Sequence, residues 1–276
     1  VRDMNADGLG DLVVQTDVFL NSGRQQGDIP IFEKRRKLSE FFSYDEPEGG
    51  LSPIYPDSWT GTTCFADLDG DGVDDISTCS KVGPFRWWKG TGMDGDRQRF
   101  TYQGKLIEAS GGEPLRPLLA ASRAPTFRVV DWDGDGLPDL VVGIRLVDYA
   151  SPLKLQPPGG WSWERAYAGT TWLGGDSLGA LVFHKNVGTK EQPKFTLGIP
   201  FRIGQDQRLA LYYDAVSPEV LDYDGDGLLD ILVCTFDRLV LYRNVGSRMK
   251  PRLADGVSLR VDGEEVLPFQ RLTLVL

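Results

Sequence analysis

Short β-branched runs alternate with acidic turns along most of the chain. Runs of this length, rich in Val, Ile and Thr and bounded by turn residues, are typical of β-strands. No helical 3.6-residue period accompanies them. The pattern therefore predicts an all-β fold in which acidic loops join strands. The runs that precede a loop are residues 62–66, 126–130 and 218–221, and those that follow one are residues 12–14, 76–79, 140–143 and 231–234.

A second block follows each loop, and in it an apolar, aromatic run ends in a polar-Gly turn. A further strand is expected to begin near Phe32, Phe100, Phe195 or Leu253. Each repeat then supplies about four strands, which is one blade of a β-propeller. Because side chains alternate along a strand, one of the adjacent residues Trp87 and Trp88 should face the core and the other should face outward. The four blocks are residues 18–23, 85–92, 181–188 and 239–246.

The repeats predict one β-propeller domain over residues 1–276. The first three acidic loops are evenly spaced, whereas a longer interval precedes the fourth. A fixed period with β patterns inside each unit is a propeller-type signature. The repeats cover approximately residues 1–60, 61–124, 125–216 (with an insertion at 145–178) and 217–276.

The acidic loops predict about four calcium ions. We number these loops 1 to 4 (residues 3–11, 67–75, 131–139 and 222–230) and count positions within each. Oxygen side chains occupy positions 1, 3, 5 and 9, the Gly at position 6 permits a positive φ, and the carbonyl of position 7 can ligate. Apolar or hydroxyl residues at position 12 separate these loops from EF-hands. The expected ligands are Asp3, Asn5, Asp7, Leu9, Asp11, Asp67, Asp69, Asp71, Val73, Asp75, Asp131, Asp133, Asp135, Leu137, Asp139, Asp222, Asp224, Asp226, Leu228 and Asp230.

These loops, each followed by a strand and, in three of the four repeats, an Asn-x-Gly turn, resemble FG-GAP/VCBS repeats over about three-quarters of the chain. The resemblance implies integrin-α-type propeller blades with a calcium ion in each loop. Loop 1 departs from the pattern at Asn5 and Ala6. An amide oxygen still ligates, so this site should be weaker rather than absent. The calcium is expected to be structural rather than catalytic, because the ligand set fills the coordination sphere.

The ends of the sequence leave two arrangements open. Loop 1 lacks a preceding strand, and residues 271–276 form a strand-like run without a following loop. Either this run completes the first blade, which would bring Leu274 to Leu12, or the chain belongs to a larger propeller. Because the chain starts at Val1 without Met, we interpret it as processed or as a fragment.

Composition adds a few exclusions. The formal net charge is −10, and four divalent ions would offset most of it. The acidic residues therefore indicate metal-binding loops rather than a negative surface that attracts cationic partners. The sequence has no block of basic residues of the kind that binds nucleic acid. It also has no run of 18 apolar residues, which a membrane-spanning helix would need. Cys64 and Cys79 flank loop 2 and either form a disulfide or, with Cys234, remain buried thiols. Calcium loops favour secretion or a periplasm.

Two functional classes compete, and a purely structural domain inside a larger extracellular protein is a third possibility. The first is a binding or cell-adhesion module for a glycan or an extracellular protein, with Trp161, Trp163 and Trp172 in the insertion as ligand-binding candidates. Those aromatic side chains could instead pack the insertion onto the propeller. The second is a polysaccharide lyase on an acidic polysaccharide, with Tyr212 or Tyr213 abstracting a proton beside Arg208. Signals for catalysis are thin, and the sole histidine, His184, suits packing in a strand better than general base catalysis.

Overall fold

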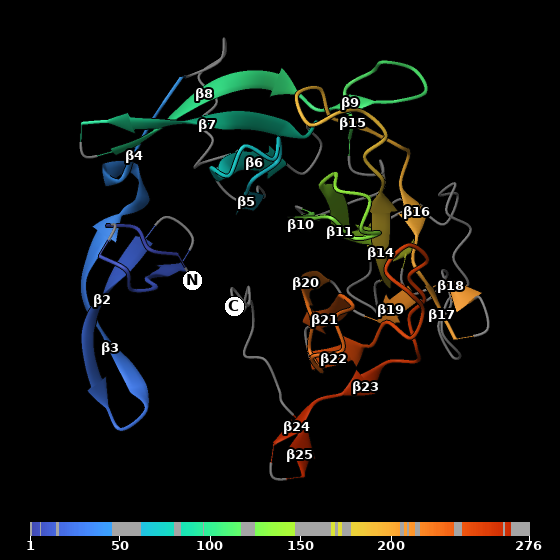
Figure 1. Ribbon diagram of the computed structural model, residues 1–276. Helices are drawn as coiled ribbons and strands as arrows, with labels where there is room; N and C mark the ends of the chain where they lie inside the picture. Colours follow the sequence, from blue (N-terminus) through green and yellow to red (C-terminus); the bar gives the residue numbers. More distant parts are fainter. Residues whose placement is uncertain are drawn as a thin grey trace.

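The chain folds into four small β-sheets arranged around a common centre, like the blades of a four-bladed β-propeller (Figure 1). The only helical segment among the described residues is one 3-10 turn, η1 (Leu38–Glu40). The all-β propeller prediction is therefore confirmed. The computed structural model describes residues 2–5, 7–14, 17–45, 62–79, 84–95, 97–116, 125–146, 167–168, 171–172, 178–204, 207–208, 210–212, 216–234, 239–261 and 263–265.

Each sheet is built from antiparallel strands that follow one another along the chain, although in sheet 3 short strands that pair elsewhere intervene. The acidic loop joins the first two strands in sheets 2 to 4. Sheet 1 contains β1 (Leu12–Val14), β2 (Asp17–Gln26) and β3 (Ile29–Lys37). Sheet 2 contains β5 (Thr62–Ala66), β6 (Asp75–Cys79), β7 (Arg86–Asp94) and β8 (Arg97–Lys105). Sheet 3 contains β10 (Thr126–Val130), β11 (Asp139–Leu146), β14 (Leu178–His184), β16 (Ile199–Pro200) and β19 (Ala210–Tyr212). Sheet 4 contains β20 (Ser217–Leu221), β21 (Asp230–Cys234), β22 (Leu239–Tyr242) and β23 (Val257–Ser258).

Neighbouring sheets are joined at their outer edges by the same backbone contact. The N–H of Asp45 donates to the carbonyl of Phe100 at 3.2 Å, and that of Ala109 donates to Phe195 at 2.8 Å. The N–H of Gly204 donates to Leu253 at 3.0 Å in the third junction. The acceptors are the residues predicted to begin the outer strands. Parallel pairing therefore locks each sheet to the next, through β4 (Phe42–Tyr44) on β8, through β9 (Ile107–Glu108) on β15 (Lys194–Phe195), and through an isolated bridge between Ile203 and Leu253.

Apolar cores fill the spaces between the sheets, because both faces of an inner sheet meet a neighbour. Trp88 lies in the core between sheets 1 and 2, whereas Trp87 lies in the core between sheets 2 and 3. The expectation that one of these indoles faces outward is wrong: both are buried. Alternation along the strand holds, but in a propeller it separates two cores rather than a core and solvent.

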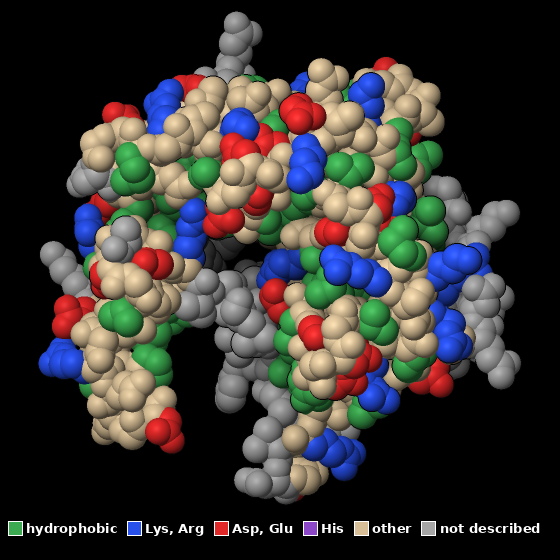
Figure 2. Space-filling model, viewed as in Figure 1, with side chains coloured by type: hydrophobic (Ala, Val, Ile, Leu, Met, Phe, Trp, Pro, Cys, Tyr) green, Lys and Arg blue, Asp and Glu red, His purple; other side chains and the backbone are tan. Residues whose placement is uncertain are grey.

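The remaining sequence predictions fall partly within the described residues. Cys64, Cys79 and Cys234 are buried thiols that form no disulfide, and Cys64 lies opposite Ser77 rather than Cys79 in the register of the hairpin. The ring-closure contact between Leu274 and Leu12 lies outside the described residues. No helix in the described part of the chain is long and apolar enough to span a membrane. Figure 2 shows acidic and basic side chains close together on one face rather than separated into fields of one sign.

Three small hairpins complete the described structure. Inside the insertion of sheet 3, β12 (Tyr167–Ala168) pairs with β13 (Thr171–Trp172). After β16, β17 (Arg202–Ile203) pairs with β18 (Gln207–Arg208). Beyond sheet 4, β24 (Arg260–Val261) pairs with β25 (Glu264–Glu265).

Candidate metal centres

The carboxylate at position 1 organises the turn of every acidic loop. In loop 2, Oδ1 of Asp67 accepts the backbone N–H groups of Gly70 and Asp71 at 2.6 and 3.1 Å, and Oδ2 accepts that of Gly72 at 2.8 Å. Asp222 accepts the corresponding three N–H groups in loop 4. The first aspartate thus stabilises the turn by accepting hydrogen bonds from the backbone that follows it. These bonds are local and depend on no other part of the fold.

The glycine at position 6 has the positive φ that the sequence predicts. Its φ is 84° in loop 1, 88° in loop 2, 89° in loop 3 and 86° in loop 4. After this reversal, the N–H of position 7 donates to the position-5 carboxylate, as Leu137 does to Asp135 at 3.0 Å. The carbonyl of position 7 as a metal ligand stays a prediction. The shared geometry means that the four loops are copies of one backbone frame.

The aspartate at position 9 anchors the loop to the sheet. Asp139 is fully buried, and its two carboxylate oxygens accept the N–H of Trp132 at 3.1 Å and of Asn186 at 2.7 Å. The same pair of bonds is made by Asp11, Asp75 and Asp230. Burial raises the pKa of Asp75 and of Asp139 to about 7, against the opposing effect of these N–H donors. Position 9 therefore has a structural task in addition to its predicted role as a ligand.

Three of the loops bring carboxylate oxygens close enough to share one ion. One oxygen from each member of a triad lies within 4.8 Å of the others. The triads are Asp67, Asp69 and Asp71 in loop 2, Asp131, Asp133 and Asp139 in loop 3, and Asp222, Asp224 and Asp230 in loop 4. Such oxygen-only sets suit a hard cation such as Ca²⁺ or Mg²⁺ better than a soft one.

Some of these oxygens are buried without a hydrogen-bond donor. They are Oδ1 of Asp69, of Asp131 and of Asp133. Asp69 is only 8% exposed, so its lone oxygen has little access to water. An unsatisfied buried acceptor costs free energy unless a donor or cation meets it. The residues present therefore fit a bound cation in loops 2 and 3.

Loop 1 differs from the other three at its centre. Asn5 replaces the aspartate at position 3, and its amide donates to Oδ2 of Asp7 at 2.9 Å while its own oxygen accepts the N–H of Asp7. The frame is otherwise retained, since Asp3 accepts the N–H groups of Asp7 and Gly8. Loop 1 thus has the fold of a metal loop with one fewer negative charge.

Basic side chains that the sequence analysis did not select reach into loops 2, 3 and 4. Lys89 contacts Asp69 and Asp71, and Lys185 contacts Asp133 and Asp135. Arg243 lies 3.2 Å from Asp224. Each of these residues immediately precedes the residue whose N–H binds position 9, and that adjacency was the available sequence signal. In sheet 1 the equivalent residue is Leu20.

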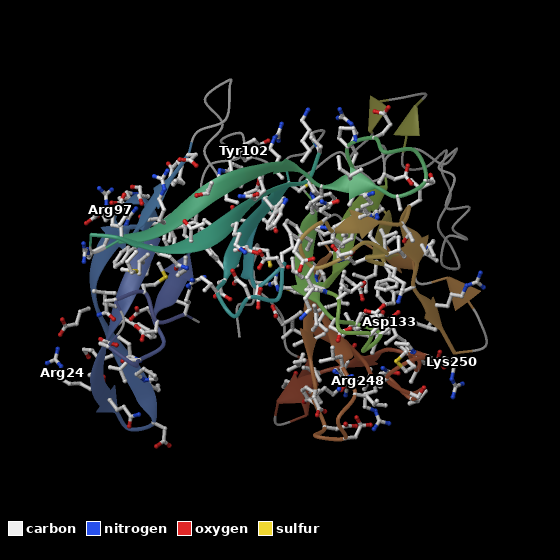
Figure 3. The ribbon with its side chains drawn as sticks, turned by 45° about the horizontal axis from the view of Figure 1, so that its top comes forward. Arg24, Arg97, Tyr102, Asp133, Arg248 and Lys250 are labelled. Carbon is white, nitrogen blue, oxygen red and sulfur yellow. The ribbon has the colours of Figure 1, made fainter. Side chains whose placement is uncertain are left out.

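A second basic side chain covers loops 2 and 3 from the following sheet. A Cβ at Gly70 would overlap the side chain of Lys190, and one at Gly134 would overlap that of Arg248. Arg248 Nη2 lies 3.8 Å from Asp131 Oδ2, and Figure 3 labels Arg248 and Asp133 on these neighbouring sheets. Glycine at position 4 therefore leaves room for the adjacent blade.

The candidate ligand-binding and catalytic residues are only partly placed. Trp161, Trp163 and Tyr213 lie outside the described residues. Trp172 lies in β13, and Arg208 and Tyr212 lie in β18 and β19 on different sheets, with only their backbones described. His184 is buried beside Phe85, with Nδ1 3.0 Å from the Thr196 carbonyl. Burial lowers its pKa to about 4, which fits the packing interpretation.

A scan against protein-family models gives no match, and a search of curated proteins gives none either.

Proposed function

We propose that this chain is a calcium-stabilised extracellular β-propeller that acts as a binding module for a glycan or an extracellular protein. The observation that carries the proposal is the repeated loop with converging carboxylates and buried oxygens that lack a donor. Calcium accepts six to eight oxygen ligands with flexible geometry and so suits a loop of carboxylates and a backbone carbonyl. The motif resemblance to FG-GAP/VCBS repeats supports the same assignment.

The loops themselves are better suited to holding the fold than to catalysis. Calcium bound at positions 1, 3, 5 and 9 would neutralise the carboxylates and tie the hairpin tip to the strand after it. Extracellular modules bind calcium with Kd values of about 10⁻⁴–10⁻³ M, which matches a compartment with abundant calcium. Recognition is assigned to the insertion of sheet 3, because loops on a rigid scaffold carry specificity.

Calcium binding is tested by calorimetric titration of the chelator-treated protein together with thermal melts. We expect saturable binding of several ions and a higher melting temperature in calcium, because a ligand that binds only the folded state stabilises it. Identical melts in calcium and in chelator would refute the structural role of calcium.

Partner binding is tested with a panel of neutral and uronic-acid polysaccharides in calcium. Retention without new unsaturated sugar ends supports a glycan-binding module, and Trp161→Ala, Trp163→Ala and Trp172→Ala should weaken that retention. Accumulation of unsaturated ends would replace the proposal with a polysaccharide lyase. Absence of retention would leave a protein partner, to be sought by cross-linking on intact cells.

A further inference from the structure

In sheets 2 to 4, a basic side chain of the protein itself contacts the carboxylates of the acidic loop. Position 9 binds the N–H of Gly90, Asn186 or Asn244, and this bond fixes the backbone of the strand that carries it. In sheets 2 to 4 the residue just before that point is Lys89, Lys185 or Arg243, and each contacts the carboxylates of its loop. In sheet 1 the equivalent residue is Leu20, which packs against the core between sheets 1 and 2.

The two lysines occupy the space between the position-3 and position-5 carboxylates. Lys89 Nζ contacts Asp69 and lies 2.8 Å from Asp71 Oδ2. Lys185 Nζ contacts Asp133 and lies 2.7 Å from Asp135 Oδ2. Each ammonium thus binds two of the oxygens that a divalent ion in the same loop would need.

Loop 4 places its basic group differently. Among the described residues, Arg243 pairs only with Asp224, at 3.2 Å, and its side chain is 56% exposed against 32% for Lys89 and Lys185. A planar guanidinium this exposed is largely screened by water. The basic side chains from the following sheet also distinguish loop 4. Lys190 approaches loop 2 and Arg248 approaches loop 3, and among the described residues no corresponding side chain reaches loop 4.

Loop 1 lacks both the position-3 carboxylate and the basic residue on the strand that would pair with it. Asn5 stands at the position that Lys89 and Lys185 neutralise in the other loops, and Leu20 stands in place of the lysine. Each loop with four carboxylates is therefore contacted by a lysine or arginine, and within the described part of the chain no basic side chain pairs with loop 1. This pairing points to charge compensation within the loop as the reason for the basic residue.

We propose that Lys89 and Lys185 are internal counter-cations that compete with calcium for loops 2 and 3, so that these loops bind the ion more weakly than loop 4. The inference rests on the proposed calcium binding. To admit the ion, the ammonium must leave the position-3 and position-5 oxygens, and the lost contacts offset part of the binding free energy. In return, the lysine limits repulsion among the carboxylates when no metal is bound.

The test uses Lys185→Met in the full chain, with terbium(III) as a luminescent calcium substitute. Trp132 stands at position 2 of loop 3, so its indole reports terbium at that loop, and the signal lost in Trp132→Phe defines the loop 3 component. Displacement of terbium by calcium then gives the affinity of this loop. We expect Lys185→Met to bind calcium about three- to tenfold more tightly while melting at a lower temperature in chelator.

Three control variants separate this effect from general damage. Lys185→Arg keeps the charge and should lie closer to the wild type in both measurements. Lys37→Met removes a lysine that pairs with Asp17 outside the loops, at 2.7 Å, and should lower stability without changing calcium affinity. Lys89→Met makes the same test in loop 2 by calorimetry, which keeps the proposal testable if Lys185→Met does not fold.

The outcomes separate the two proposals. Tighter calcium binding with a lower melting temperature in chelator supports the inference. Calcium binding by the wild type that is unchanged or weakened in both Lys→Met variants overturns the inference and leaves the proposed function standing. Failure of the wild type to bind calcium overturns both.

Discussion

Loop 1 and loop 3 have the same backbone frame but different charges at their centres. In both, position 1 curls the turn, position 6 has a positive φ, and a buried aspartate at position 9 joins the loop to the next strand. At the centre, loop 1 has Asn5, and Leu20 stands at the strand position equivalent to Lys185, whereas loop 3 has Asp133 in contact with Lys185. The comparison separates two tasks: positions 1, 6 and 9 build the turn, and positions 3 and 5 set its charge.

The largest effect should come from breaking the shared frame. Asp139→Ala removes the acceptor for the N–H groups of Trp132 and Asn186 and leaves both buried. Each unsatisfied donor costs about 1–3 kcal/mol, so the free energy of unfolding should fall by about 3 kcal/mol. Urea unfolding in chelator measures this. A loss seen only in calcium would mean that position 9 acts as a ligand and not as an anchor.

A smaller effect is expected from the centre of the same loop. Asp135→Ala removes one predicted metal ligand, and in the metal-free protein it removes a partner of Lys185 at 2.7 Å. We expect weaker calcium binding at loop 3 and a lower melting temperature in calcium, with little change in chelator, since a partly exposed ion pair contributes only about 0–1 kcal/mol. If the melting temperature fell equally in calcium and in chelator, the centre of the loop would contribute to the metal-free fold as the frame does, and the distinction between the two would be wrong.

The strand that carries Lys185 also has a pH-sensitive group that sheet 1 lacks. His184 is buried, as are the equivalent residues Trp88 and Tyr242, whereas Phe19 in sheet 1 is partly buried. Its pKa falls from 6.5 to about 4 on burial, so the unfolded chain takes up a proton first as the pH drops. Stability from this group is complete above pH 6.5 and is lost as the pH falls toward 4.

His184→Phe should therefore reduce the acid sensitivity of folding. Between neutral pH and pH 5, the wild type should lose about 2 kcal/mol more than the variant. Urea unfolding at several pH values gives the difference, with other titrating groups cancelling between the two proteins. Parallel pH curves would show that His184 is not buried in its neutral form.

The smallest effect is expected from converting loop 1 toward loop 3. Asn5→Asp adds the missing carboxylate and removes the amide that donates to Asp7. Calcium affinity at loop 1 should rise by a few fold, because the added charge acts in an exposed loop where water screens it. Calorimetry in calcium measures the change. A weaker site would show that the amide orders the loop and is not a substitute for a ligand.

Local signals allowed much of this protein to be predicted from its sequence. The β-branched runs predicted strands such as β5 (Thr62–Ala66) and β10 (Thr126–Val130) at the bounds found, because strand formation and turn chemistry depend on adjacent residues. The positive φ of Gly72 and Gly136 was likewise predictable, since a tight reversal around a carboxylate requires it. The repetition of these local elements predicted a propeller, because similar units bury their faces by packing against one another.

The tertiary structure alone decided which side chains share an environment. Trp87 and Trp88 are adjacent, yet they enter different cores because each inner sheet has a neighbour on both faces. Lys185 and Asp133 are far apart in the chain and meet only when β14 pairs with β11, and Arg248 reaches loop 3 only from the next sheet. The loop sequence is local and could be recognised directly. The charges that act on it come from strands and sheets whose positions depend on the complete fold.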